Sequence, residues 1–100
     1  MKLNSVICGD AVSEMQKIAD ESVDLIVADP PYNLGKDYGN NHDLRGFDEY
    51  LDFTHSWLTE AKRILKNDGT IFAFMGVRFI SYLYQIMDRD LKLFFNSWIC

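Results

Sequence analysis

The sequence contains little proline, glycine and cysteine, and no hydrophobic run long enough to cross a bilayer. Only 2 prolines and 6 glycines occur among 100 residues, while 14% of the residues are aromatic, which excludes collagen-like and disordered chains. Apolar runs such as Ile71–Met75 are too short for a transmembrane helix, so we expect no membrane association. The first residues also lack the apolar core and cleavage site of a signal peptide, which favours a cytoplasmic protein.

The cysteines, histidines and net charge disfavour a disulfide-bonded protein, a metal site and a self-sufficient nucleic-acid binder. Cys8 and Cys100 lie far apart in strand-like contexts, which favours buried thiols over a disulfide or a metal site. The single histidines His42 and His55 lack the spacing of metal ligands, so no metal is assigned to them. The net charge of −5 lacks the basic excess that is typical of a self-sufficient nucleic-acid binder.

Hydrophobic patterns predict strands and helices in alternation along the chain. Strands are expected at Ser5–Gly9, Val23–Ala28, Thr70–Met75 and Leu91–Cys100. Helices are expected after Asp10 with apolar positions to Ala19, from Phe47 to the Asn67–Gly69 turn, and after Gly76 to Met87. Residues 30–46, which hold both prolines, are expected to form a loop. Strands joined by crossover helices indicate an α/β fold with a mostly parallel sheet and helices on its faces.

The strongest functional signal is Asp29-Pro30-Pro31-Tyr32, directly after the second expected strand. That strand, Val23–Ala28, is almost wholly apolar, which predicts burial on both faces. Ligands of open α/β sheets bind at the carboxyl ends of such strands. Two successive prolines fix φ and remove two backbone donors, so the loop is stiff and its carbonyl groups are free to accept hydrogen bonds.

This combination suits an exocyclic amino group on a planar base. The Asp29 carboxylate and the Pro30 carbonyl can accept its two hydrogens and direct the nitrogen lone pair at an electrophile. Tyr32 can stack on the base, which reaches such a pocket only by flipping out of a duplex. The alternative is a rigid turn that merely ends a strand. The polar, glycine-containing loop that follows favours a site.

Further segments give this pattern a family resemblance. Gly9-Asp10, the run Asp24–Gly35, and the stretch from Trp57 through Leu65–Phe72 are similar to the amino-group DNA methyltransferases of the permuted β group. The resemblance covers essentially the whole chain and rests on the combination, because Asp-Pro-Pro-Tyr alone is only suggestive. It implies a Rossmann-like, three-layer, mostly parallel α/β methyltransferase fold that is incomplete in residues 1–100.

The resemblance also implies a reaction and a set of roles. A methyl group passes from S-adenosylmethionine to the N6 amino group of a flipped adenine in double-stranded DNA. The matching positions for catalysis are Asp29, Pro30, Pro31 and Tyr32, and those for cofactor binding are Asp10, Asp29 and Pro30. Asp10 is equally suited to cap a helix. Cytosine N4, RNA adenine and a protein glutamine amide are alternative targets, although an aspartate that opens the motif favours adenine.

One family element is absent from these residues. The glycine-rich Phe-x-Gly-x-Gly loop, which wraps the methionine end of the cofactor, has no counterpart, because no Gly-x-Gly occurs. In the permuted order this loop follows the target-recognition region, so we expect residues 1–100 to be the N-terminal, catalytic part of a longer enzyme and inactive alone. The basic DNA-reading surface then belongs to the later part. A restriction endonuclease and a second copy of the chain are further candidate partners, and a non-catalytic interaction module is the competing function.

Overall fold

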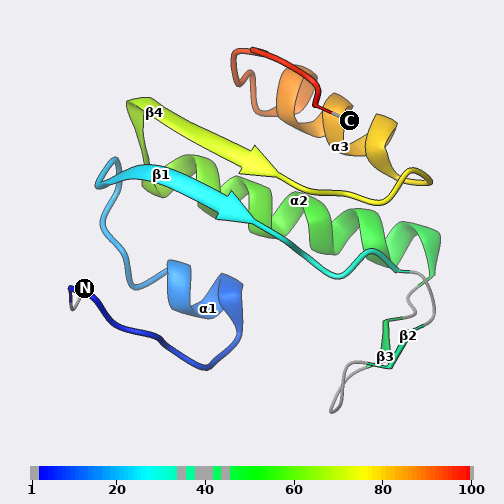
Figure 1. Ribbon diagram of the computed structural model, residues 1–100, viewed down its shortest axis with the longest axis horizontal. Helices are drawn as coiled ribbons and strands as arrows, with labels where there is room; N and C mark the ends of the chain where they lie inside the picture. The colour runs from blue at the N-terminus through cyan, green and yellow to red at the C-terminus, as the bar shows by residue number, and fades with distance from the viewer. Residues whose placement is uncertain (1–2, 34–35, 38–41, 44–45, 100) are drawn as a thin grey trace.

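The computed structural model of the chain describes residues 3–33, 36–37, 42–43 and 46–99. In chain order the elements are helix α1 (Ala11–Met15), strands β1 (Val23–Ala28), β2 (Lys36–Asp37) and β3 (His42–Asp43), helix α2 (Phe47–Ile64), strand β4 (Leu65–Ala73), helix α3 (Ile80–Gln85) and the π-helical turn η1 (Ile86–Asp90). Figure 1 shows β1 and β4 side by side, with the long helix α2 running beside them.

Strands β1 and β4 form a parallel pair that is connected through α2. The predicted α/β arrangement with a parallel sheet is therefore confirmed for this small part of a fold. The register pairs Leu25 with Thr70 and Ala28 with Ala73, and it is irregular between Val23 and Leu25. We expected α2 to continue to the Asn67–Gly69 turn, but it ends at Ile64. The reason is that the next residue already has extended backbone angles and pairs with β1.

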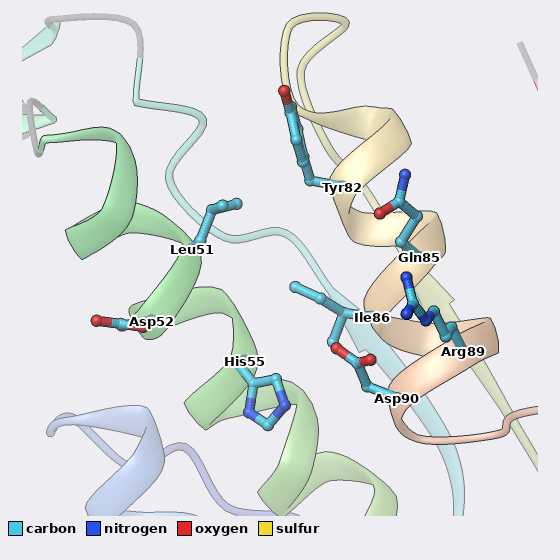
Figure 2. Close-up of a pocket in the computed structure, with 8 residues that line it drawn as sticks. All are labelled: Leu51, Asp52, His55, Tyr82, Gln85, Ile86, Arg89 and Asp90. Carbon is cyan, nitrogen blue, oxygen red and sulfur yellow. The ribbon is translucent and has the colours of Figure 1, made fainter.

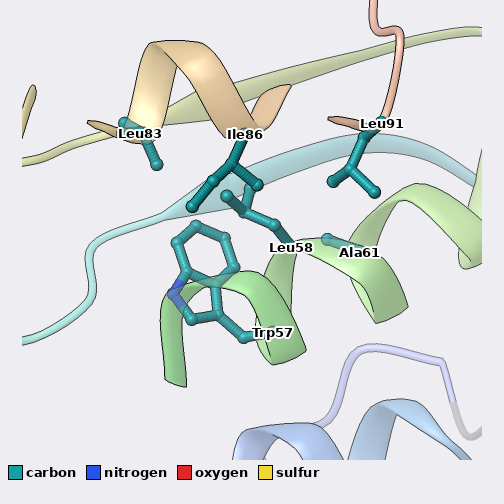
Figure 3. Packing of buried hydrophobic residues seen from close by; sticks show 6 residues of the cluster. All are labelled: Trp57, Leu58, Ala61, Leu83, Ile86 and Leu91. Carbon is teal, nitrogen blue, oxygen red and sulfur yellow. The ribbon is translucent and has the colours of Figure 1, made fainter. Parts of the chain in front are cut away.

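The core lies on one face of this sheet. Helix α2 buries side chains at the predicted helical spacing, namely Tyr50, Thr54, Trp57, Leu58, Ala61 and Ile64. Figure 3 shows three of these, Trp57, Leu58 and Ala61, packed against Leu83, Ile86 and Leu91 from the C-terminal third of the chain. The sheet contributes Ile26, Ala28, Ile71 and Ala73 to the same cluster.

The opposite face of the sheet is uncovered among the described residues. Leu25 and Val27 of β1 are 55% and 63% exposed, and Phe72 and Phe74 are 47% and 52% exposed. The prediction that β1 is buried on both faces is therefore wrong for this chain. The physical reason is that the described core packs only against the alternate side chains, such as Ile26 and Ala28.

The strand expected at Ser5–Gly9 does not form. This segment pairs with neither strand of the sheet, and Val6 is fully exposed. Cys8 is exposed as well, so the expectation of a buried thiol is wrong there, and Cys100 lies outside the described residues. A strand forms only where its backbone groups pair with those of a neighbouring strand, which explains why an apolar, β-branched sequence alone does not make one.

The strand expected at Leu91–Cys100 is also absent through residue 99. Lys92 has a φ of 56°, which interrupts an extended conformation at the second residue of the segment. The rings of Phe95 and Trp98 lie against Tyr84 of α3 instead. The ring centroid of Tyr84 is 5.1 Å from that of Phe95 and 5.8 Å from that of Trp98.

The remaining elements are close to the predictions, with corrections to their bounds: the strand expected at Thr70–Met75 is β4, which spans Leu65–Ala73. Helix α1 ends at Met15, short of Ala19, because the chain passes into turns stabilised by bonds such as Ile18 N to Met15 O at 2.9 Å. The helix expected after Gly76 is present as α3 and η1. Part of the loop expected at 30–46 is a short antiparallel hairpin of β2 and β3. In the described ranges, no helix combines the length and the apolar character needed to cross a bilayer.

Candidate active site

The Asp29-Pro30-Pro31-Tyr32 segment follows the carboxyl end of β1. The end of β4 lies beside it, because the backbone amide of Phe74 donates to the carbonyl of Ala28 at 2.9 Å. Gly76, two residues further on, lies against the motif. A Cβ atom at that position would be 3.4 Å from the Cβ of Tyr32. The motif is therefore at the edge of a parallel sheet where α/β proteins bind their ligands.

The two side chains with a predicted chemical role contact each other. The Tyr32 hydroxyl donates a hydrogen bond to Oδ1 of Asp29 at 2.6 Å, a length typical of a hydroxyl bonded to a carboxylate. The structure thus brings the acceptor and the aromatic ring together within four residues. A carboxylate has about four lone-pair positions on its two oxygens, so this single bond leaves Asp29 able to accept further donors.

The backbone of the motif is held from α2. The Tyr50 hydroxyl donates to the carbonyl oxygen of Pro31 at 2.5 Å and lies 3.1 Å from Sδ of Met75. Tyr50 is completely buried. We did not single out this residue from the sequence, where it is one member of an apolar helical stripe. Its signal is that a buried tyrosine needs a partner for its hydroxyl, which a phenylalanine does not.

Asn33 ends the rigid part of the segment. Its φ is 60°, in the left-handed region that asparagine tolerates better than most residues. Its side chain is buried, with 6% of its surface exposed. A left-handed residue changes the chain direction directly after Tyr32, so the motif is bounded by a strand before it and a left-handed residue after it.

Asp10, the sequence-predicted cofactor ligand, caps α1. Its Oδ2 atom accepts hydrogen bonds from the backbone amide and the hydroxyl of Ser13, both at 2.9 Å. These bonds, the backbone one first, lower the pKa of the Asp10 carboxyl below its ordinary value. The helix-capping alternative is therefore confirmed. These contacts join Asp10 to Ser13 and not to the Asp-Pro-Pro-Tyr segment, so a role toward a cofactor stays a prediction.

A depression of about 280 Å³ lies elsewhere, between α2 and the α3–η1 segment. Figure 2 shows its lining, which is mostly polar and charged: Leu51, Asp52, His55, Tyr82, Gln85, Ile86, Arg89 and Asp90. No residue of the motif contributes to it. Because it lies between two helices and is lined by none of the motif residues, we do not place the chemistry there.

Two expectations concern residues that the structure describes only in part. The loop expected at 30–46 includes residues 34–35, 38–41 and 44–45, which lie outside the described residues. Within the described ranges, no three His, Cys, Asp or Glu side chains are grouped as they would be around a metal ion. The candidate site therefore consists of Asp29 to Asn33 together with Tyr50 and Gly76.

Comparison with known proteins identifies relatives along most of the chain. A family model described as DNA methylase, of the N6/N4 type, matches residues 23–100. The chain is 51% identical over 94 residues to the type II methyltransferase M.HpaI of Haemophilus parainfluenzae, covering 94% of this chain and 30% of the relative. It is 37% identical over 98 residues to the type II methyltransferase M.BamHI of Bacillus amyloliquefaciens, covering 97% of this chain and 23% of the relative.

A third relative carries a more specific name. The chain is 41% identical over 68 residues to the DNA adenine methyltransferase YhdJ of Escherichia coli K12, covering 68% of this chain and 23% of the relative. The chain thus spans less than a third of the length of these curated relatives. The family model covers well over half of the chain, including the Asp-Pro-Pro-Tyr segment and every element that positions it. The chain therefore belongs to the N6/N4 DNA methylase family.

Proposed function

We propose that this chain is the catalytic part of a DNA methyltransferase that transfers a methyl group from S-adenosylmethionine to the N6 amino group of a flipped adenine. The observation that carries the proposal is the Asp29 carboxylate held 2.6 Å from the Tyr32 hydroxyl at the carboxyl end of a parallel strand. Membership of the N6/N4 DNA methylase family supports an amino nitrogen as the methyl acceptor. A relative named as a DNA adenine methyltransferase supports adenine in particular.

In the proposed reaction, the motif prepares the amino nitrogen for attack. One hydrogen of the amino group is accepted by the Asp29 carboxylate and the other by the Pro30 carbonyl. Because both hydrogens are held, the nitrogen lone pair is less delocalised into the ring and points away from the acceptors. Tyr32 stacks on the flipped base, a contact worth about 1–3 kcal/mol in single-strand binders. The Tyr32–Asp29 bond adjusts as the base enters.

S-Adenosylmethionine supplies an electrophilic methyl group when it is bound. The acceptor groups of this chain fit part of it, since the carboxylate of Asp10 and the carbonyl of Pro30 suit amino and hydroxyl hydrogens of a nucleoside. The sequence offers no glycine-rich loop for the methionine end. We therefore propose that residues outside this chain hold that end, and that residues 1–100 alone are inactive.

The uncovered sheet face supports a longer, three-layer domain. Leu25 and Val27 of β1, Phe72 of β4 and Phe74 directly after β4 are exposed apolar side chains. Parallel sheets are normally covered by helices on both faces. We propose that later parts of the enzyme supply that second helical layer and the basic surface that reads double-stranded DNA. We further propose a cytoplasmic enzyme. Its candidate partners are a restriction endonuclease and a second copy of the chain.

The test is methylation of adenine-containing duplex DNA by the full-length enzyme and by its Asp29→Ala variant. We expect a loss of activity on the order of 100- to 1000-fold, as for removal of one preorganised electrostatic group. Asp24→Ala is the matched control, because Asp24 lies on β1, the strand that precedes Asp29, and forms an exposed ion pair with Lys66 at 2.8 Å. Equal activity of Asp29→Ala and the control would refute the assigned mechanism.

Parallel assays with cytosine-only targets and with RNA distinguish the alternative substrates. Cofactor binding by residues 1–100 tests the alternative of a non-catalytic interaction module.

A further inference from the structure

We propose that Tyr50 is a positioning residue for methyl transfer, whose hydroxyl fixes the shape of the Asp-Pro-Pro-Tyr segment through the carbonyl of Pro31. The inference rests on the proposed function, since it concerns the same site. It goes further, because Tyr50 lies on α2, outside the motif that the family resemblance singles out. It also explains why a tyrosine occupies a completely buried position in the apolar stripe of this helix.

The first argument is the contact itself. The hydroxyl of Tyr50 is 2.5 Å from the Pro31 oxygen, and Sδ of Met75 lies further away, at 3.1 Å. A hydroxyl has one proton, and a carbonyl oxygen is a stronger acceptor than a thioether sulfur. The proton is therefore assigned to the Pro31 oxygen. This bond joins residues 19 positions apart, so it ties two separate elements together.

The second argument is which motion the bond removes. The pyrrolidine ring of Pro31 already fixes its φ, and the peptide bonds on both sides are planar. The one soft backbone angle left at this residue is ψ, which sets the direction of its carbonyl group. Because Tyr50 binds that carbonyl, it fixes ψ. The same angle determines where the next residue, Tyr32, begins.

The third argument is that Tyr50 is itself held in place. Its ring centroid is 4.6 Å from that of Phe79 and 6.1 Å from that of Phe53. Its backbone amide donates to the carbonyl of Gly46 at 2.9 Å in the first turn of α2. A donor that is packed on its sides and anchored at its backbone can define the position of a loop, whereas an exposed tyrosine would follow the loop.

These contacts link Tyr50 to the reacting groups. The Tyr32 ring and the Asp29 carboxylate are separated by the two prolines, and they meet through a hydrogen bond of 2.6 Å. A change in ψ at Pro31 moves the ring relative to the carboxylate and to the Pro30 carbonyl. A misplacement of about 1 Å can reduce the rate of a positioned reaction by about 100-fold. Loss of the Tyr50 hydroxyl is therefore expected to slow chemistry more than it weakens folding.

The experiment compares Tyr50→Phe with Thr54→Val in the full-length enzyme. The first variant keeps the ring and removes only the hydroxyl. The second removes another buried hydroxyl one turn later in α2, which bonds the Tyr50 carbonyl at 2.8 Å and does not touch the motif. We measure kcat and KM for methylation of adenine-containing duplex DNA, cofactor affinity, thermal unfolding, and the fluorescence of 2-aminopurine placed at the target base.

The inference predicts that Tyr50→Phe lowers kcat by about 10- to 100-fold, with cofactor affinity within about twofold and an altered 2-aminopurine signal in the bound complex. Thr54→Val is expected to keep kcat near that of the unsubstituted enzyme while showing a similar shift in thermal unfolding. A kcat of Tyr50→Phe within twofold of the unsubstituted enzyme overturns the inference, and so does an equal loss in both variants. Absence of methylation by the unsubstituted enzyme would instead refute the proposed function, so the two failures are distinguishable.

Discussion

The middle of the chain and its two ends differ in how the same kind of sequence is packed. In the middle, α2 and the inner faces of β1 and β4 bury their apolar side chains, and Leu58 is completely enclosed. At the ends, the apolar segments 5–9 and 91–99 form no strands, and Val6 and Phe94 are 100% and 94% exposed. Both regions are rich in apolar residues. The middle combines a paired strand with a covering helix, whereas neither end segment joins a strand pair in the described part of the chain and only some residues of 91–99, such as Leu91, pack on the core.

This contrast shows that a strand-like pattern indicates which segments can form strands. Whether such a segment does form one depends on a neighbouring element against which it can pair and pack. Strand β1 is the intermediate case, because its inner side chains are packed and its outer ones, Leu25 and Val27, are more than half exposed. A strand has two faces and two edges, and each needs its own partner. The predictions below test whether the middle of the chain carries most of its stability.

The largest effect is expected from the centre of the core. Leu58→Ala should lower the free energy of unfolding by about 2–5 kcal/mol, because it removes a completely buried side chain and leaves a cavity. Ile99→Ala, at a side chain that is 77% exposed, should change it by less than about 0.5 kcal/mol. Urea denaturation of both variants measures the difference. Similar losses in the two variants would remove the distinction between middle and end.

A smaller loss is expected at the irregular start of the sheet. A Cβ atom at Gly69 would lie 2.6 Å from Cδ1 of Leu65 and 3.0 Å from the backbone oxygen of Asp24. Gly69→Ala should therefore cost about 1–3 kcal/mol through overpacking against backbone that cannot move away cheaply. Gly46→Ala is the control, because no atom lies within 4 Å of the added carbon there. A well-tolerated Gly69→Ala would show that β1 and β4 can separate at this point.

The side chain of Arg63 in α2 connects the N-terminal region to the middle of the chain, so its substitution should lower the thermal stability. Its guanidinium bonds the carbonyls of Met15 and Ile18 at 2.7 and 2.9 Å, and it pairs with Asp20 and Glu60. Arg63→Lys keeps the charge but cannot make this forked set of bonds, so it should lower the thermal midpoint. The exposed pair of Lys17 with Glu14 provides the control through Lys17→Gln, which should lower the midpoint less.

The smallest effect concerns the cap of α1. Ser13→Ala removes the hydroxyl that bonds Asp10, so the lowered pKa of this carboxyl should move back toward its ordinary value. Because the folded-state pKa is depressed, the stabilisation from the cap is present above the unfolded-state pKa and is lost as the pH falls through the folded-state value. NMR titration of the Asp10 carboxyl measures the shift. An unchanged titration curve would assign the depression to the Ser13 backbone amide alone.

The sequence was sufficient to predict those features that depend on local pattern. The apolar spacing of α2 predicts its buried face, and the run Val23–Ala28 predicts β1 with the same bounds. Asp10 as a helix cap also follows from its position before an apolar helix. Each of these outcomes is decided by residues within a few positions of one another, or by one strong hydrophobic stripe.

The remaining features depend on contacts between distant residues. The bond from Tyr50 to Pro31 requires the first turn of α2 to lie beside the motif, and no local pattern gives that distance. The early end of α2 at Ile64 arises because Leu65 pairs with Val23, across the whole crossover. The terminal segments 5–9 and 91–99 also depend on distant partners. Their sequence pattern is compatible with strands, but in the described residues neither segment pairs with β1 or β4.

The rigidity of the motif has a consequence for the energetics of binding. Two proline rings, a left-handed Asn33 and the bond from Tyr50 leave the segment few alternative conformations. A site that is already ordered loses little conformational entropy when its target arrives, so more of the contact energy remains as affinity. Base extrusion from the duplex is itself unfavourable by a few kcal/mol. In the proposed reaction, an ordered site would therefore help to capture a base that spends little time outside the duplex.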